Sequence, residues 1–493
     1  MGKPTVHPTG VTIYNPEKCF NGYTVFPAPE TGVVLIDMNG GVVNFWDKLH
    51  AFPAKLLPGG QVFGSLGARN NEYGYQDQLD LVQVDWDGNV VWKFDHLEYV
   101  EDPGYEPQWM ARQHHDYQRE GNPVGYYVPG MECKTDGGNT LILCHQNTYN
   151  TKISEKRLLD DVFIEVDWEG NIVWEWHASD HFHEMGFSDN AKNAIYRNPN
   201  MHENGGGMGD WLHINSMSVL GPNKWYDEGD ERFHPDNIIW DGREANISAI
   251  IDKKTGKIVW QMGPDFSATK ELRRIGQIIG QHHVHMIPRG LPGEGNILIF
   301  DNGGWAGYGV PSNVSFDGVK ANHADRSRII ELNPVTMKVV WELTAGKLGY
   351  GPSINNYRIY SPLTSSAQRL PNGNTFITEG VGFRAFEVTP QNEVVWEFWS
   401  PFTDALAPMV YRTYRYPYDY VPQLERPVET PVPRLDNKTF RVPGAAPGQL
   451  DNRVTVAGTT GYGIKQEFCV ATDEEQPKVL TDEEEEAAAY KKF

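Results

Sequence analysis

Four short phrases of this sequence place histidine beside other polar residues at the ends of predicted β-strands. Imidazole loses its proton near neutral pH, so it can act as a nucleophile, a general acid or base, or a metal ligand. One buried His often serves only as a hydrogen-bonding residue of the core, but several at one position of a repeated unit predict a common site. The phrases are Gln113-His114-His115-Asp116, Leu143-Cys144-His145-Gln146, His213-Ile214-Asn215-Ser216 and Gln281-His282-His283-Val284-His285.

A second candidate is Arg243, which ends the predicted strand that follows the His213 phrase. The planar guanidinium donates paired hydrogen bonds that suit sulfate, phosphate or carboxylate. The same Arg could instead form an ion pair with Asp241 or Glu244, and the sequence leaves both interpretations open. Because the chain has a net charge of −22, an anionic substrate would need such a local cation to bind.

The elements that must position these side chains are predicted by a phrase that recurs six times. Each copy has an apolar run, an Asp or Glu, a turn usually rich in Asn and Gly, and a strand that contains a Trp. Asn, Gly and Asp tolerate the positive φ of tight hairpin turns, so each copy predicts a β-hairpin. The copies run from Leu35 to Trp46, Val84 to Trp92, Val166 to Trp174, Ile251 to Trp260, Ile330 to Trp341 and Glu387 to Trp396.

Six copies of one hairpin unit predict an all-β protein, a six-bladed β-propeller. The Trp residues are unevenly spaced, which predicts long inter-strand insertions in some blades. The innermost strand of each propeller blade faces the central channel. We therefore expect His115, His213 and His283 to point into one channel.

The repeats also set the predicted domain bounds. Residues 1–30 are expected to form a leader segment, and residues 31–407 the propeller. Residues 408–493 are expected to form an irregular extension, rich in Pro and Tyr, that wraps the propeller and ends in an acidic helical tail.

Composition limits the partners. The strong negative charge argues against nucleic acid or an anionic membrane, and no apolar run approaches the roughly 20 residues of a membrane span. Because the first residues lack an apolar signal core, the expected location is cytoplasmic. The four Cys residues are then expected to be reduced thiols, although Cys133 and Cys144 could face each other across a hairpin. A small aromatic or anionic substrate is the expected partner, and a homo-oligomer is possible.

Taken in order, several phrases resemble the arylsulfotransferase family, the 3′-phosphoadenylyl-sulfate-independent enzymes that move sulfate from one phenol to another. The resemblance covers most of residues 10–400 and implies a six-bladed propeller that works through a sulfated histidine. The phrases are Gly10-Val11-Thr12-Ile13-Tyr14, Gly22-Tyr23-Thr24-Val25-Phe26, Leu35-Ile36-Asp37, His213-Ile214-Asn215-Ser216, Gln281-His282, Phe300-Asp301-Asn302-Gly303 and Leu370-Pro371-Asn372-Gly373-Asn374.

The resemblance also implies roles for individual residues. The nucleophile is His282 or His283, and the blade position favours His283. The other implied catalytic residues are His115, His213 and Arg243, and the implied substrate-binding residues are His114, His145, Asn215 and His285. This chain departs from family members that are exported and carry an N-terminal β-domain and a disulfide. The family Arg also follows Ser-Ser, whereas Arg243 follows Asp241-Gly242.

Other functions stay open. Sulfuryl transfer needs no cofactor, but the surplus of histidines is compatible with a metal ion in the central channel, held by His115, His213 and His283. Copper, zinc or iron there would make an oxidase, lyase or hydrolase that acts on a small aromatic substrate. A quinoprotein is suggested only by the segment from Asp252 to Trp260, and a non-catalytic scaffold would leave the converging His and Arg unexplained.

Overall fold

The structure is a computed structural model that describes residues 9–28, 32–74, 76–201, 208–351, 353–402 and 409–434. These residues all belong to one compact unit, residues 1–434. The predicted acidic tail falls within residues 435–493, outside the described residues.

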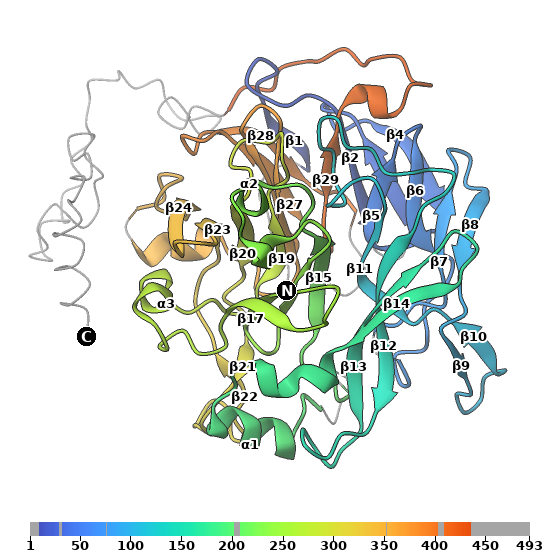
Figure 1. The fold of residues 1–493 in the computed structure, drawn as a ribbon. Helices are drawn as coiled ribbons and strands as arrows, with labels where there is room; N and C mark the ends of the chain where they lie inside the picture. The colour runs from blue at the N-terminus through green and yellow to red at the C-terminus, as the bar shows by residue number, and fades with distance from the viewer. Residues whose placement is uncertain are drawn as a thin grey trace, which may run out of the picture. The chain divides into compact units, whose positions relative to one another are not determined.

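Six antiparallel sheets, five of four strands and one of five, are here called blades 1 to 6. They follow one another around a ring and form a β-propeller (Figure 1). The predicted fold is confirmed. Blade 1 consists of β29 (Tyr414–Tyr416), β2 (Tyr23–Ala28), β3 (Gly32–Ile36) and β4 (Val42–Asp47), and blade 2 of β5 (His50–Leu57), β6 (Gln61–Ser65), β7 (Leu81–Val84) and β8 (Val90–Phe94). Blade 3 consists of β11 (Gln113–Arg119), β12 (Thr140–Thr148), β13 (Leu158–Val166) and β14 (Ile172–His177), and blade 4 of β15 (Ile214–Val219), β16 (Ile238–Gly242), β17 (Ile247–Ile251) and β18 (Ile258–Met262). Blade 5 consists of β19 (His282–Met286), β20 (Ile297–Asp301), β23 (Arg328–Asn333) and β24 (Lys338–Leu343), and blade 6 of β25 (Ser365–Arg369), β26 (Thr375–Glu379), β27 (Arg384–Val388) and β28 (Val394–Trp399).

The Trp of the repeated phrase lies in the outermost strand of its blade and joins that blade to the next. In five blades its indole nitrogen donates a hydrogen bond to a backbone carbonyl in the turn before the next outermost strand, while the ring fills apolar space between sheets. The pairs are Trp46 with Asp85, Trp92 with Trp168, Trp174 with Lys253, Trp260 with Pro334 and Trp396 with Met38. The last pair joins blade 6 to blade 1.

The ring is closed by strands from both ends of the described chain. β29 pairs with β2 as the innermost strand of blade 1, and β1 (Gly10–Tyr14) pairs with β28 as a fifth strand of blade 6. The predicted propeller bounds, residues 31–407, therefore exclude three of its strands. The predicted leader contributes β1 and β2, and the predicted extension contributes β29, because each completes the hydrogen bonding of a blade edge.

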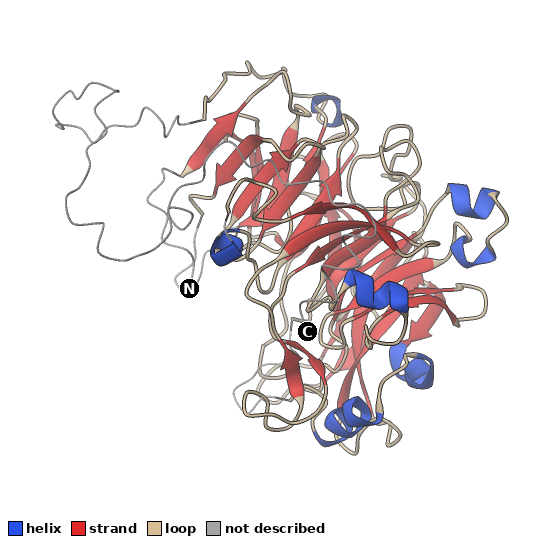
Figure 2. Cartoon of the chain, turned by 90° about the vertical axis from the view of Figure 1, so that its left-hand side faces the viewer, coloured by secondary structure: helices blue, strands red, loops and turns tan. Residues whose placement is uncertain are grey.

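The predicted insertions are present and contain all the described helices except η4, and these helices are short and lie in connections between strands (Figure 2). None of the helices in the described ranges is long and apolar enough to cross a membrane. The described cysteines, Cys19, Cys133 and Cys144, are free thiols. The insertions comprise β9 (Glu98–Val100), β10 (Gln108–Met110), η1 (Ala178–Glu184), α1 (Asp189–Arg197), α2 (Lys224–Asp227), η2 (Glu231–Phe233), α3 (Lys270–Ile275), β21 (Ala306–Tyr308), β22 (Val319–Asn322) and η3 (Ser353–Arg358), and η4 (Tyr418–Tyr420) follows β29.

Candidate active site

The predicted histidines lie where the innermost strands of blades 3, 4 and 5 begin, at positions that are buried throughout. Neighbouring innermost strands contact each other, so residues far apart in the sequence meet here. His114 and His115 are on β11, His213 immediately precedes β15, His282, His283 and His285 are on β19, and His145 is near the end of the adjacent β12.

Three of these histidines have an unusual backbone conformation. His115 and His283 both have φ of 54°, and His213 has φ of 52°, a left-handed region that non-glycine residues rarely adopt. The β11–β12 ladder shifts register after Gln113, and the β19–β20 ladder shifts after His282. Bulges of this kind re-aim side chains, and backbone strain concentrates at functional sites.

Four of the histidines form one group, which we call the four-histidine cluster: His114, His115, His145 and His213. The His114 and His145 rings stack with centroids 3.5 Å apart. The Nδ1 atoms of His114 and His115 are 2.7 Å apart, and the rings of His115 and His213 meet edge to face with centroids 4.6 Å apart. The predicted convergence is therefore observed for blades 3 and 4.

Three buried carboxylates border the four-histidine cluster. Burial, together with the charge of Asp210, raises the pKa of Asp161 to about 7. The sequence prediction missed all three, although acidic residues inside the apolar strand Leu158–Val166 were a usable signal. The contacts are Asp77 Oδ1 to His145 Nδ1 at 2.6 Å, Asp210 Oδ2 to His213 Nδ1 at 2.5 Å and Asp161 Oδ1 to His114 Nε2 at 3.3 Å.

His282 is fixed in one orientation and one tautomer. Its Nδ1 lies 2.9 Å from Asn302 Oδ1 and 3.1 Å from the Gly280 carbonyl oxygen. The Gly280 oxygen can only accept, so Nδ1 carries the proton and Nε2 carries the lone pair. Burial, followed by the charge of Arg243, lowers the pKa of His282 well below its usual value.

Arg243 is buried at the end of β16, beneath the insertion that contains β21. It pairs with Glu244 through Nη1 and donates from Nη2 to the Trp305 carbonyl at 3.1 Å. The ion pair that the sequence offered as an alternative is therefore present. Arg243 is also near enough to His282 for its charge to act on that imidazole.

His283 lies in a separate group with His285 and two tyrosines. The rings of His283 and His285 are 4.3 Å apart, and Tyr414 Oη is 3.3 Å from His283 Nε2. Tyr126 Oη is 2.9 Å from His285 Nε2. The contacts of His283 therefore differ from those of His282.

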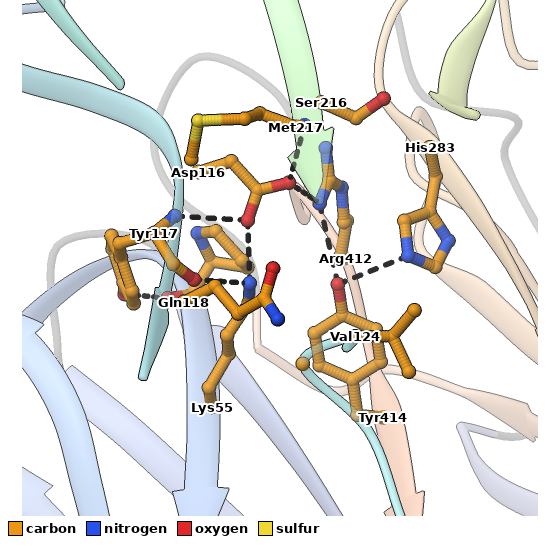
Figure 3. Close-up of polar contacts among 12 residues, drawn as sticks. Lys55, Asp116, Tyr117, Gln118, Val124, Ser216, Met217, His283, Arg412 and Tyr414 are labelled. Carbon is orange, nitrogen blue, oxygen red and sulfur yellow. Dashed lines mark hydrogen bonds and ion pairs between the residues drawn. The ribbon is translucent and has the colours of Figure 1, made fainter. Parts of the chain in front are cut away.

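A buried ion network connects the blades around His283 (Figure 3). Asp116 Oδ1 accepts from Lys55 at 2.5 Å, and Asp116 Oδ2 accepts from Arg412 at 2.8 Å. Arg412 also donates to Tyr414 Oη at 3.3 Å. The sequence prediction missed both Lys55 and Arg412. Arg412 was missed because it lies in the segment that was interpreted as an extension.

Burial keeps the imidazoles of His114, His115, His283 and His285 neutral near pH 7. It lowers the pKa of His114 and His285 to about 4 and that of His115 and His283 well below the usual value. A neutral imidazole has a lone pair for nucleophilic attack or for metal coordination.

The remaining predicted residues have the following surroundings. Asn215 Nδ2 donates to the Gln281 carbonyl at 2.9 Å, so Asn215 links blades 4 and 5.

The predicted metal ligands do not come together as one group. These are His115, His213 and His283, and His283 faces Tyr414 instead of the other two. Among the described residues, the one group of three possible ligands within 4.8 Å of one another is His114, His145 and Asp161.

A pocket of about 340 Å³ lies beside the four-histidine cluster. Arg69 and Arg112, which line it, both contact Asp77, the carboxylate that holds His145. Arg157 and Asn147 also line the pocket, together with the acidic residues Glu98, Glu101 and Asp102.

The chain is similar to several solved structures and to one protein family. Of the solved structures, the match to a Bacteroides caccae protein of unknown function covers 80% of this chain and 98% of that chain, at 10% identity and a TM-score of 0.42. The match to the Dos1 propeller covers 80% of this chain and 77% of that chain, at 10% identity and a TM-score of 0.32. The match to streptogramin B lyase covers 81% of this chain and 85% of that chain, at 11% identity and a TM-score of 0.31. No curated protein matches. Residues 131–398, more than half of the chain, match the family described as Arylsulfotransferase (ASST), and the chain therefore belongs to the arylsulfotransferase family.

Proposed function

We propose that this protein transfers a sulfuryl group from an aryl sulfate to a phenolic acceptor, with His282 as the covalent nucleophile. Family membership supports an arylsulfotransferase-like function in general. The observation that carries the specific proposal is the orientation of His282, whose Nδ1 faces two oxygen atoms and whose Nε2 therefore bears the lone pair.

The choice between the two adjacent histidines follows from their surroundings. A nucleophile for sulfate esters needs a cation near the sulfuryl oxygens, because negative charge shifts among them during transfer. Cations act on both imidazoles, Arg243 on His282 and Arg412 on His283, but the Nε2 atom of His283 faces the Tyr414 hydroxyl. The blade position had favoured His283, and the surroundings support His282 instead.

His213 is the proposed acid and base. Asp210 holds its Nδ1 at 2.5 Å, and His213 is near enough to His282 to influence the pKa of His282. In the first half-reaction, His282 Nε2 bonds to sulfur, the bond from sulfur to the aryl oxygen breaks, and His213, which enters as the imidazolium paired with Asp210, protonates the departing phenolate and becomes neutral. In the second, His213 takes the proton of the acceptor phenol, whose oxygen displaces His282 from sulfur.

An aromatic wall beside the cluster supports a phenolic substrate. The rings of Phe52 and Tyr411 are 4.0 Å apart, and Phe52 is 4.5 Å from the His115 ring. Flat aromatic substrates stack favourably on such side chains. His115, which contacts both this wall and His213, is placed to orient the substrate.

The proposal predicts ping-pong kinetics. We expect the protein to release nitrophenol from nitrophenyl sulfate only slowly alone, and much faster when a second phenol is added. Initial rates measured at several fixed phenol concentrations should give parallel double-reciprocal lines. Intersecting lines would show that both substrates bind before transfer and would contradict a sulfated enzyme.

A further inference from the structure

The unusual feature of the four-histidine cluster is a set of buried polar atoms that point at one another without hydrogen bonds. Four such atoms have no hydrogen-bond partner among the described residues, and each is sealed from solvent. They are His114 Nε2, His145 Nε2, Asp161 Oδ1 and Asp210 Oδ1. An unpaired buried polar atom costs about 1–3 kcal/mol, so four together require an explanation.

Three of these atoms, on His114, His145 and Asp161, lie within 4.8 Å of one another, close enough to share one ion. Zn²⁺ bonds to nitrogen and oxygen of about 2.0–2.1 Å put neighbouring ligands of a tetrahedron about 3.3 Å apart. Asp161 Oδ1 lies 3.3 Å from His114 Nε2 and 3.7 Å from His145 Nε2. Asp210 Oδ1 lies 3.9 Å from His145 Nε2. Because the His114 and His145 rings stack with 19° between their planes, one of them must rotate for both Nε2 lone pairs to point at one ion.

The other atoms of these side chains are already held by hydrogen bonds. Asp77 accepts from His145 Nδ1 at 2.6 Å, which fixes the tautomer that leaves His145 Nε2 free to coordinate. Metal-binding histidines in proteins are usually oriented by such a carboxylate. Asp161 Oδ2 accepts from the Ile214 amide at 3.1 Å, and Asp210 Oδ2 faces His213 Nδ1 at 2.5 Å.

The net charge of these four side chains also favours a bound cation. Two ionised carboxylates and two neutral imidazoles have a charge of −2, which one divalent cation balances. Mixed imidazole and carboxylate donors suit zinc and similar transition ions better than calcium or magnesium. The competing explanation is a proton retained on Asp161.

We propose that His114, His145, Asp161 and Asp210 bind one divalent transition cation, most favourably Zn²⁺. The four ligands leave no position for substrate, so the ion has a structural and positioning role. His115 contacts one ligand and His213 contacts another. The ion therefore fixes the two imidazoles nearest the proposed sulfuryl-transfer site, but the metal site itself does not depend on that function.

Metal content of the purified full-length protein tests this proposal. After loading with ZnCl₂ and gel filtration, mass spectrometry of the metal should find about one zinc per chain. Asp161→Asn should lower the zinc content at least about 10-fold. The matched control is Asp160→Asn: Asp160 is the buried neighbour on the same strand, but it accepts from Trp211 and Ser179 and faces away from the cluster, so zinc should be retained.

A second measurement covers the case in which Asp161→Asn does not fold. The parent protein loaded with Co²⁺ should show the strong visible absorption of a four-coordinate ion, and excess Zn²⁺ should abolish it. Zinc that is absent from the loaded parent, or equal in parent and folded Asp161→Asn, would overturn the proposal. Absent zinc would favour the proton on Asp161 and would leave sulfuryl transfer untouched.

Discussion

His282→Ala should lower kcat/KM for an aryl sulfate on the order of 10⁴-fold or more while the protein stays folded. The substitution removes the Nε2 atom to which sulfur would be transferred. Steady-state assays with nitrophenyl sulfate and phenol measure the effect, and circular dichroism checks the fold.

His283→Ala is the matched control, because it removes the adjacent buried imidazole of the same strand. It should lose far less activity than His282→Ala, since His283 contacts Tyr414 and His285 instead. If His283→Ala is inactive and His282→Ala retains activity, then His283 is the nucleophile.

Arg243→Lys should lower kcat by about 10²-fold or more, although the positive charge is kept. The planar guanidinium can donate to Glu244, to the Trp305 carbonyl and to a sulfuryl oxygen at once, whereas a single ammonium cannot reproduce that geometry. The loss should appear in kcat more than in KM, because the charge on the sulfuryl oxygens changes most in the transition state.

Arg232→Lys is a suitable control for Arg243→Lys. Arg232 pairs with Asp230 near the surface, and this variant should behave as the parent does. Parental kcat in Arg243→Lys would mean that Arg243 serves only as the partner of Glu244.

The fold was predictable because its strongest signal is local. The turn with its Asp and the Trp that follows lie within one hairpin, and the same Trp makes the hydrogen bond to the next blade. The closure of the ring was not predictable in the same way. β29 is only three residues long, and its pairing partner β2 is almost 400 residues away along the chain.

The site was predictable as far as equivalent positions in the repeat could show it. His115 and His213 do meet, as their places in successive blades indicated. The repeat could not distinguish His282 from His283, because their directions depend on a bulge after His282. Nor could it place Asp161 and Asp210 beside the histidines, since that contact depends on how two blades pack.

The most direct test of the central claim is to trap the sulfated protein. We expect that aryl sulfate added without acceptor releases one phenol per chain in a burst, and that the protein gains the mass of one sulfuryl group. Digestion near neutral pH should locate that group on the peptide that contains His282, and added phenol should remove it. A protein that turns over aryl sulfate with no burst and no added mass would contradict the account.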